Sequence, residues 1–78
     1  MSQKLYEVVS KVMNVPLAKI NENSNPESIE NWDSFSFYVL LDEIESAFGI
    51  KFTLEETLQI KNVGDFEKRL TSHGISLN

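Results

Sequence analysis

The residue best placed to do chemistry in this chain is Ser34, which follows Asp33 at the start of an amphipathic segment. Aspartate is a preferred N-cap residue, so we expect Asp33 to cap a helix that begins at Ser34. The backbone N–H groups and the dipole at a helix N-terminus favour a bound anion. The sequence therefore predicts an exposed serine to which a phosphate-linked group could be attached.

Ser34 is not expected to act as a catalytic nucleophile. A catalytic serine needs a base within hydrogen-bond reach, usually a histidine that a third group orients. The single histidine, His73, lies near the C-terminal end, where we expect a surface residue. The chain has no cysteine, so it offers no thiolate nucleophile, thiolate metal site or disulfide. We expect that the protein is not an enzyme and that Ser34 is a substrate for one.

One segment has the alternate spacing of a calcium-binding loop, namely Asn21, Asn23 and Asn25. The sixth position of that loop, however, is Pro26 instead of glycine, and the twelfth is Trp32 instead of glutamate. Because the candidate ligands are also neutral, we expect no metal site.

The composition indicates one small acidic domain over residues 1–78. The apolar content of 41% and the five phenylalanines are enough for a single core. The net charge of −5 disfavours nucleic acid and anionic membranes as partners and favours basic protein surfaces. Nothing at the N-terminus resembles a signal peptide, and no apolar run approaches the ~18 residues of a membrane span. We expect a cytoplasmic monomer.

The helix that begins at Ser34 is expected to bury one face. Winding residues 34–48 at ~100° per residue places six side chains on one stripe. This predicted core stripe consists of Phe37, Leu40, Leu41, Ile44, Ala47 and Phe48. Gly49 then provides a C-terminal stop.

The opposite face of the same helix carries Phe35, Tyr38 and Val39, with Asp42 beside them. This face could dock partner enzymes, because aromatic residues anchor interfaces. Alternatively, the preceding loop and a third helix could cover it and make it part of the core. Tyr38 is the better candidate for burial and Phe35 for contact with partners.

The segments before this helix predict one helix and a long connection. Ser2 is expected to cap a helix that runs to about Met13, with apolar residues at helical spacing. Residues 15–32 contain both prolines and three apolar anchors, which are Val15, Leu17 and Ile20. Within them, residues 26–29 are expected to form a short helical turn.

The segments after it predict two more helices. Residues 50–54 alternate like a strand, but no second strand is visible to pair with them, so we expect a loop. Thr53 and Glu56 have capping-box spacing and open a short helix to about Leu58. Asn62 is expected to cap a last helix, which Gly74 ends.

Asp33-Ser34-Phe35 resembles the Asp-Ser-Leu motif that begins the second helix of acyl carrier proteins. The resemblance continues in order over essentially the whole chain. It includes the first helix, the long Pro/Asn-containing loop, "E-x-x-F-G-I-x-F" at residues 45–52, a short third helix and "V-G-D-F" at residues 63–66. The resemblance implies an all-α four-helix bundle with a short third helix and a long loop between the first two helices.

The resemblance also implies a function for Ser34. Its Oγ would carry a 4′-phosphopantetheine arm, added from coenzyme A by a phosphopantetheinyl transferase, whose thiol holds an acyl or aminoacyl group as a thioester. Asp33 would cap the helix and be recognised with it. Further partners would be an acyl- or aminoacyl-activating ligase and a downstream acyltransferase or synthase. Their basic surfaces would meet Asp42, Glu43 and Glu45. An unmodified protein-interaction module with the carrier fold remains the alternative.

The chain departs from the pattern of fatty-acid-synthesis carriers. Those carriers have acidic residues two and five positions after the serine, where this chain has Ser36 and Val39. Its loop ends in Asn-Trp-Asp-Ser, without the glycine of fatty-acid and peptide carriers. These features are more similar to stand-alone carriers of specialised pathways, and they leave the cargo open.

Overall fold

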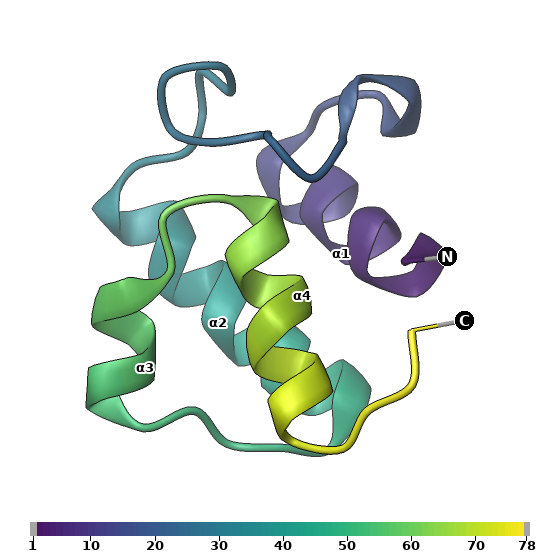
Figure 1. Ribbon diagram of the computed structural model, residues 1–78. Helices are drawn as coiled ribbons and strands as arrows, with labels where there is room; N and C mark the ends of the chain where they lie inside the picture. Colours follow the sequence, from purple (N-terminus) through teal and green to yellow (C-terminus); the bar gives the residue numbers. More distant parts are fainter. Residues whose placement is uncertain (1, 78) are drawn as a thin grey trace.

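The computed structural model describes residues 2–77, and these form four α-helices and one 3₁₀ turn (Figure 1). In chain order the elements are α1 (Gln3–Met13), η1 (Leu17–Lys19), α2 (Ser34–Phe48), α3 (Leu54–Gln59) and α4 (Val63–Ser72). No strand occurs among the described residues, and residues 50–53 form a loop, as predicted. The all-α bundle with a short third helix and a long α1–α2 loop is therefore confirmed. None of the helices in this range is long and apolar enough to cross a membrane.

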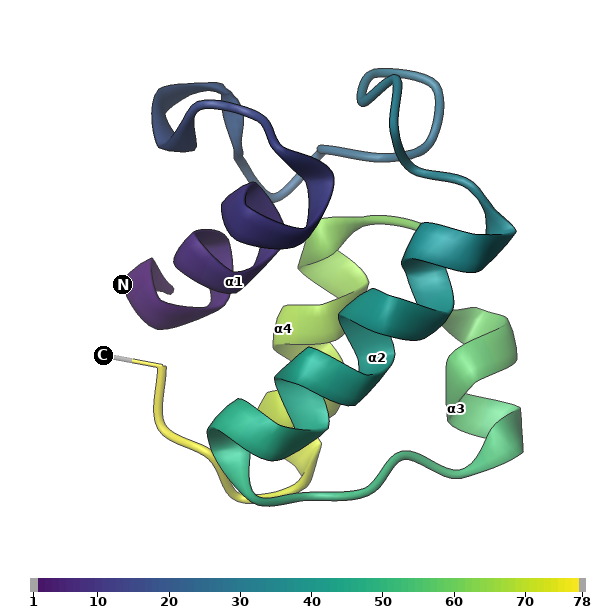
Figure 2. The same ribbon diagram turned by 180° about the vertical axis from the view of Figure 1, so that it is seen from behind.

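Helices α2 and α4 occupy the centre of the bundle, and α1 and α3 stand at opposite edges (Figures 1 and 2). The ring centroids of Phe37 on α2 and Phe66 on α4 lie 6.1 Å apart, which fixes the approach of the two central helices. The long loop passes from the end of α1 to the start of α2 across one end of the bundle (Figure 1). The start of α2 is thus held by the loop that precedes it and by the packing of α2 against α4.

The core draws on all the long helices and on the loop. Fully buried side chains come from α1, α2 and α4, and the loop adds Ile20, Ile29 and Trp32 at 6% exposure or less. The buried apolar residues are Leu5, Val9, Met13, Ile20, Ile29, Trp32, Leu40, Leu41, Ile44, Ile60, Val63, Phe66 and Leu70. Because hydrophobic stabilisation scales with the apolar area removed from water, these side chains supply most of the driving force for folding.

The predicted core stripe of α2 is confirmed at its centre. Leu40, Leu41 and Ile44 are buried, whereas Phe37 and Phe48 are half-buried and pack against the core. The Lys4 Nζ lies 5.0 Å from the centroid of the Phe48 ring, a cation–π distance. Phe48 is therefore an edge residue rather than a fully buried one.

Three of the predicted helix ends form as expected. Asn62 caps α4 by accepting a 2.8 Å hydrogen bond from the Asp65 N–H. Thr53 and Glu56 form the predicted capping box of α3. Gly49 ends α2 with φ 68°, a left-handed conformation that glycine adopts without steric cost.

The predicted cap of α1 is wrong in its mechanism. Ser2 stands at the N-cap position, but its side chain makes no capping hydrogen bond. Its hydroxyl instead donates to the carboxylate of Glu67 on α4. The hydroxyl therefore bonds to a residue on another helix instead of capping α1, and no local sequence pattern reveals such a partner.

The long loop is held by hydrogen bonds at two places. Near its end, the Asn31 side chain donates a 2.7 Å hydrogen bond to the Met13 carbonyl at the end of α1. At its middle, the Gly64 N–H donates to the Glu22 carbonyl at 2.7 Å, and a Cβ at position 64 would lie only 3.0 Å from that oxygen. The approach of the loop to α4 thus requires the glycine.

The apolar anchors that the sequence predicts for this loop are used unequally. Ile20 is buried and Val15 packs against the core, but Leu17 stays 38% exposed in the 3₁₀ turn, which the sequence did not predict. The turn at residues 26–29 forms as expected, with the Ile29 N–H donating to the Asn25 carbonyl at 2.9 Å.

The core assignment predicts different costs for two phenylalanine substitutions. Phe66 is fully buried and Phe35 is 79% exposed, so the same change removes contacts at only one of them. Phe66→Ala should lower the free energy of unfolding by about 3–5 kcal/mol, and Phe35→Ala should change it by less than about 0.5 kcal/mol. Thermal and urea unfolding followed by circular dichroism measure both. Should Phe66→Ala fail to fold, Phe66→Leu must still melt below Phe35→Ala, and equal melting would contradict the assignment.

Candidate functional site

Ser34 is the first residue of α2 and is exposed to solvent. Within residues 2–77 its hydroxyl has no hydrogen-bond partner. The preceding residue, Asp33, has an extended backbone, and its Oδ1 accepts a 2.9 Å hydrogen bond from the Ser36 N–H. Asp33 is therefore the N-cap that the sequence predicts, and it leaves the Ser34 hydroxyl open to solvent.

The cap is reciprocal, which the sequence analysis missed. The Asp33 N–H donates a 2.9 Å hydrogen bond to the Ser36 Oγ, which completes a capping box. The usual residue at the far end of such a box is glutamate or glutamine. The spacing of Asp33 and Ser36 could have indicated the box, but the sequence pattern presented Ser36 only as a position without the acid of fatty-acid carriers.

A shallow groove of about 320 Å³ adjoins Ser34. It is lined by Pro26, Trp32, Asp33, Ser34, Phe37 and Ile60. The Trp32 ring stacks on Phe37, with centroids 6.5 Å apart and planes at 16°. Since offset stacking holds both rings in place, the groove has a fixed apolar wall beside the serine.

The outer face of α2 is open rather than covered. Phe35, Tyr38 and Val39 are 79%, 69% and 39% exposed, and Asp42 beside them is exposed as well. The alternative in which the loop and α3 cover this face is wrong, and so is the expectation that Tyr38 is buried. The reason is that hydrogen bonds to the end of α1 and the start of α4 hold the loop across one end of the bundle (Figure 1).

The acidic residues of α2 differ in how far their charges are engaged. The Glu45 Oε2 accepts a 2.8 Å hydrogen bond from the Phe52 N–H, and its Oε1 lies 3.9 Å from the Lys51 Nζ. Glu43 is half-buried, with Oε1 3.7 Å from the Lys11 Nζ. Exposed pairs of this kind are worth little. Asp42 is thus the most available of the three carboxylates, and Glu45 also fastens the loop that follows α2.

Helix α3 exposes two leucines that the sequence analysis did not single out. Leu54 and Leu58 are 77% and 71% exposed. Their spacing of four residues puts them on one face of α3, and the same spacing is typical of a buried stripe. Here the stripe is exposed instead, on a helix that stands at the edge of the bundle (Figure 2).

The structure places His73 against α3. Its Nε2 lies 2.9 Å from the Glu56 Oε2, and its ring meets Phe52 edge-on with centroids 5.8 Å apart. The hydrogen bond from the Thr53 N–H, together with His73, holds the pKa of Glu56 below its usual value. His73 thus joins the end of α4 to α3 and does not serve Ser34 as a base.

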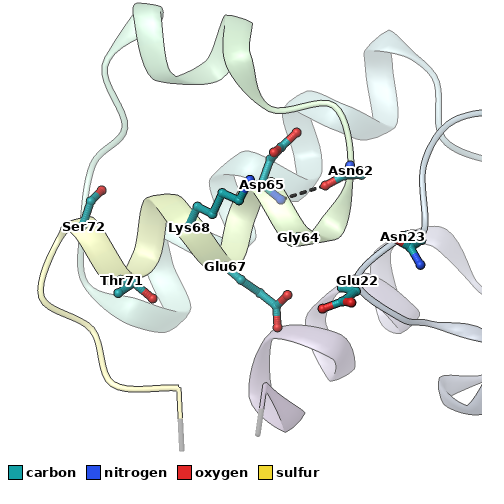
Figure 3. A pocket seen from close by; sticks show the side chains of 9 residues that line it. All are labelled: Glu22, Asn23, Asn62, Gly64, Asp65, Glu67, Lys68, Thr71 and Ser72. Atoms are coloured by element: carbon teal, nitrogen blue, oxygen red, sulfur yellow. Dashed lines mark hydrogen bonds between the residues drawn. The ribbon is translucent and has the colours of Figure 1, made fainter.

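A larger hollow of about 690 Å³ lies between the loop and α4, away from Ser34 (Figure 3). Figure 3 shows Glu22 of the loop and Glu67 of α4 pointing toward each other across it. The other lining residues are also mostly polar and include Asn23, Asn62, Asp65 and Lys68. Over residues 2–77, no group of three or more His, Cys, Asp or Glu side chains is arranged to hold a metal ion.

The fold and the site together define a helical carrier domain with an exposed serine at the start of its second helix. A family model described as the phosphopantetheine attachment site matches residues 3–70. The chain therefore belongs to this family, that of the acyl carrier proteins. Domains of the family are the site of covalent 4′-phosphopantetheine attachment, and they interact with partner enzymes such as transferases and synthases. A search of curated proteins found no matching relative.

The residues at the start of α2 fit such a group. The Ser34 hydroxyl is exposed, so an enzyme can reach it without unfolding the bundle. The N-terminus of α2 would favour a negative phosphodiester by about 0.3–1 kcal/mol. The apolar wall of Trp32 and Phe37 is adjacent.

The Asp33 cap predicts a pH-dependent contribution to stability. The hydrogen bond from the Ser36 N–H lowers the pKa of Asp33 below its ordinary value of 3.8. A carboxylate with a lowered pKa in the folded state stabilises the protein above its unfolded pKa, and this stabilisation is lost as the pH falls through the folded pKa. Asparagine caps a helix without titrating. Between about pH 7 and pH 2.5, the wild type should therefore lose more melting temperature than Asp33→Asn.

Thermal unfolding of both proteins across this range measures the difference. Asp42→Asn is the matched control, because Asp42 is exposed on α2 and does not cap the helix. If Asp33→Asn and Asp42→Asn reduce the acid-induced loss of melting temperature equally, the capping carboxylate makes no special contribution to the pH dependence of stability.

Proposed function

We propose that Ser34 is the residue that carries the phosphopantetheine arm through its Oγ. The observation that supports this most is the exposed hydroxyl at the N-terminus of α2, which is directly preceded by the capping Asp33. In the described range the hydroxyl has no competing hydrogen bond, so it is available to an incoming enzyme. Asp33 caps the first turn of α2, and the transferase would recognise it together with the serine.

The proposed function is that of a carrier that presents an acyl or aminoacyl group to other enzymes. The arm, when attached, supplies the thiol that binds this group as a thioester, and the chain has no cysteine of its own. The protein residues would hold the arm at the end of the bundle and keep the thiol outside the packed core. The alternative, an unmodified interaction module, would leave the exposed Ser34 without a function.

The outer face of α2 is the proposed docking surface for the enzymes that load and unload the arm. Phe35, Tyr38 and Val39 offer apolar contacts, and Asp42 offers a charge to basic partner surfaces. Glu43 and Glu45 would add to this negative field, although each already contacts a lysine. The exposed Leu54 and Leu58 of α3 extend the apolar surface of the domain.

The first experiment concerns attachment. We expect the protein to gain the mass of one phosphopantetheine when it is incubated with coenzyme A and a broad-specificity phosphopantetheinyl transferase. Ser34→Ala should abolish the gain and leave the melting temperature nearly unchanged, because Asp33 is the cap. Ser46→Ala, at the exposed far end of α2, is the control and should still be loaded. Intact mass spectrometry measures all three, and an unchanged mass of the wild type would refute the proposed function.

The second experiment concerns partner choice. Val39 stands where fatty-acid carriers have an acid, so an elongation enzyme loses one expected ion pair. Because an exposed pair is worth about 0.2–1 kcal/mol, Val39→Glu should raise the rate of malonyl transfer onto the loaded protein by about 1.5- to 5-fold. The gain should shrink with added salt. Malonyl-transfer kinetics at low and high salt test this, with Val39→Gln as the uncharged control. A wild type that is malonylated as fast as a fatty-acid carrier, with no gain in Val39→Glu, would contradict a specialised pathway.

A further inference from the structure

The segment before Ser34 is held by side chains that the proposed attachment chemistry does not itself use. Ser36 has one hydroxyl proton to donate and two lone pairs to accept with. Its Oγ accepts the Asp33 N–H at 2.9 Å and lies 2.6 Å from the Asn31 carbonyl oxygen, to which it donates. The Asp33 carbonyl oxygen is farther away, at 3.2 Å. The hydroxyl therefore links the residues on both sides of Trp32.

Asn31 carries this link to the first helix. While its carbonyl accepts from Ser36, its side-chain amide donates a 2.7 Å hydrogen bond to the Met13 carbonyl. Met13 is the last residue of α1, and its side chain is fully buried. Residues 31–33 are thus connected by hydrogen bonds to the end of α1 on one side and to the first turn of α2 on the other.

Trp32 closes the arrangement from the core side. The residue is 6% exposed, its ring stacks on Phe37, and its backbone N–H donates to the Ile29 carbonyl at 3.1 Å. A buried ring between two hydrogen-bonded neighbours leaves the chain little freedom to rotate. Ser34 directly follows these residues. Its side chain is exposed, but the backbone before it is held in place.

An acidic residue at position 36 could not replace this bridge. An ionised carboxylate accepts hydrogen bonds but has no proton to give to the Asn31 carbonyl. It would also stand beside the Asp33 carboxylate, and like charges at this range destabilise each other. The serine at position 36 therefore makes hydrogen bonds that an acidic residue could not make, in addition to lacking an acid's charge.

We propose that Ser36, together with Asn31, is a positioning residue that holds Ser34 in the conformation loaded by the transferase. This inference rests on the proposed attachment at Ser34. Neither side chain reaches the reacting atoms; each acts through the backbone of residues 31–34. Since positioning determines how often the serine is presented correctly, its loss should lower the turnover of loading more than the binding of the carrier.

The test compares Ser36→Thr with Ser36→Val, which have the same shape and differ in the hydroxyl. Loading by the transferase with saturating coenzyme A is followed by mass spectrometry, at a temperature where circular dichroism shows every variant to be folded. We expect Ser36→Thr to load within about twofold of wild type and Ser36→Val to lose about 3- to 10-fold in kcat, with KM changed by less than about twofold. Ser46→Ala should load like wild type. Asn31→Ala, which removes only the link to Met13, should also lower kcat.

A second measurement does not depend on loading. The Asp33 amide should exchange its hydrogen faster in Ser36→Val than in Ser36→Thr, because it loses its acceptor. If Ser36→Val loads with the kcat of Ser36→Thr, or if the Asp33 amide exchanges equally in both, the positioning role is refuted. If the wild type gains no mass at all, the proposed attachment fails instead, so the two outcomes are separable.

Discussion

The start of α2 is exposed to solvent and yet held in a fixed conformation by the residues beside it. A helix N-terminus leaves backbone N–H groups without intrahelical partners, and an exposed one would fray unless side chains satisfied them. Here Asp33 and Ser36 satisfy two of these groups reciprocally. Because both partners lie in the chain beside Ser34, the first turn is ordered without any side chain having to cover the serine.

A series of aromatic contacts packs the first turn of α2 against the core. Ring contacts run from Trp32 to Phe37, from Phe37 to Phe66 and from Phe66 to Phe52. They connect the end of the loop, α2, α4 and the loop before α3 through one packed series. Interiors of proteins are close-packed and transmit displacements, so a change at Phe66 should be felt at the loop end more than a change at Phe35. The position of the serine is therefore coupled to the core, even though the serine itself is in solvent.

The parts of the fold that local patterns determine could be predicted from the sequence. The caps at Asp33, Thr53 and Asn62 are short-range hydrogen bonds, and the apolar periodicity of α2 correctly placed Leu40, Leu41 and Ile44 in the core. What failed depended on long-range partners. The Ser2 hydroxyl was taken up by Glu67 on another helix, and the burial of Tyr38 depended on where the loop would pack. No periodicity within one element carries that information.

Ser36 differs from an acidic residue both in charge and in the hydrogen bonds it can make. By comparison with fatty-acid carriers, the serine counts as a missing charge; by its contacts, it is a donor and an acceptor that an ionised acid cannot imitate. The two descriptions have different physical consequences, because a charge acts on approaching partners over about a Debye length while a hydrogen bond acts on the backbone it touches. A carrier with serine here gives up some long-range attraction and gains a rigid approach to its second helix. If the outer face of α2 docks partners as proposed, Asp42 would supply the remaining long-range attraction, and the apolar side chains of this face would add short-range contacts that select partners by shape.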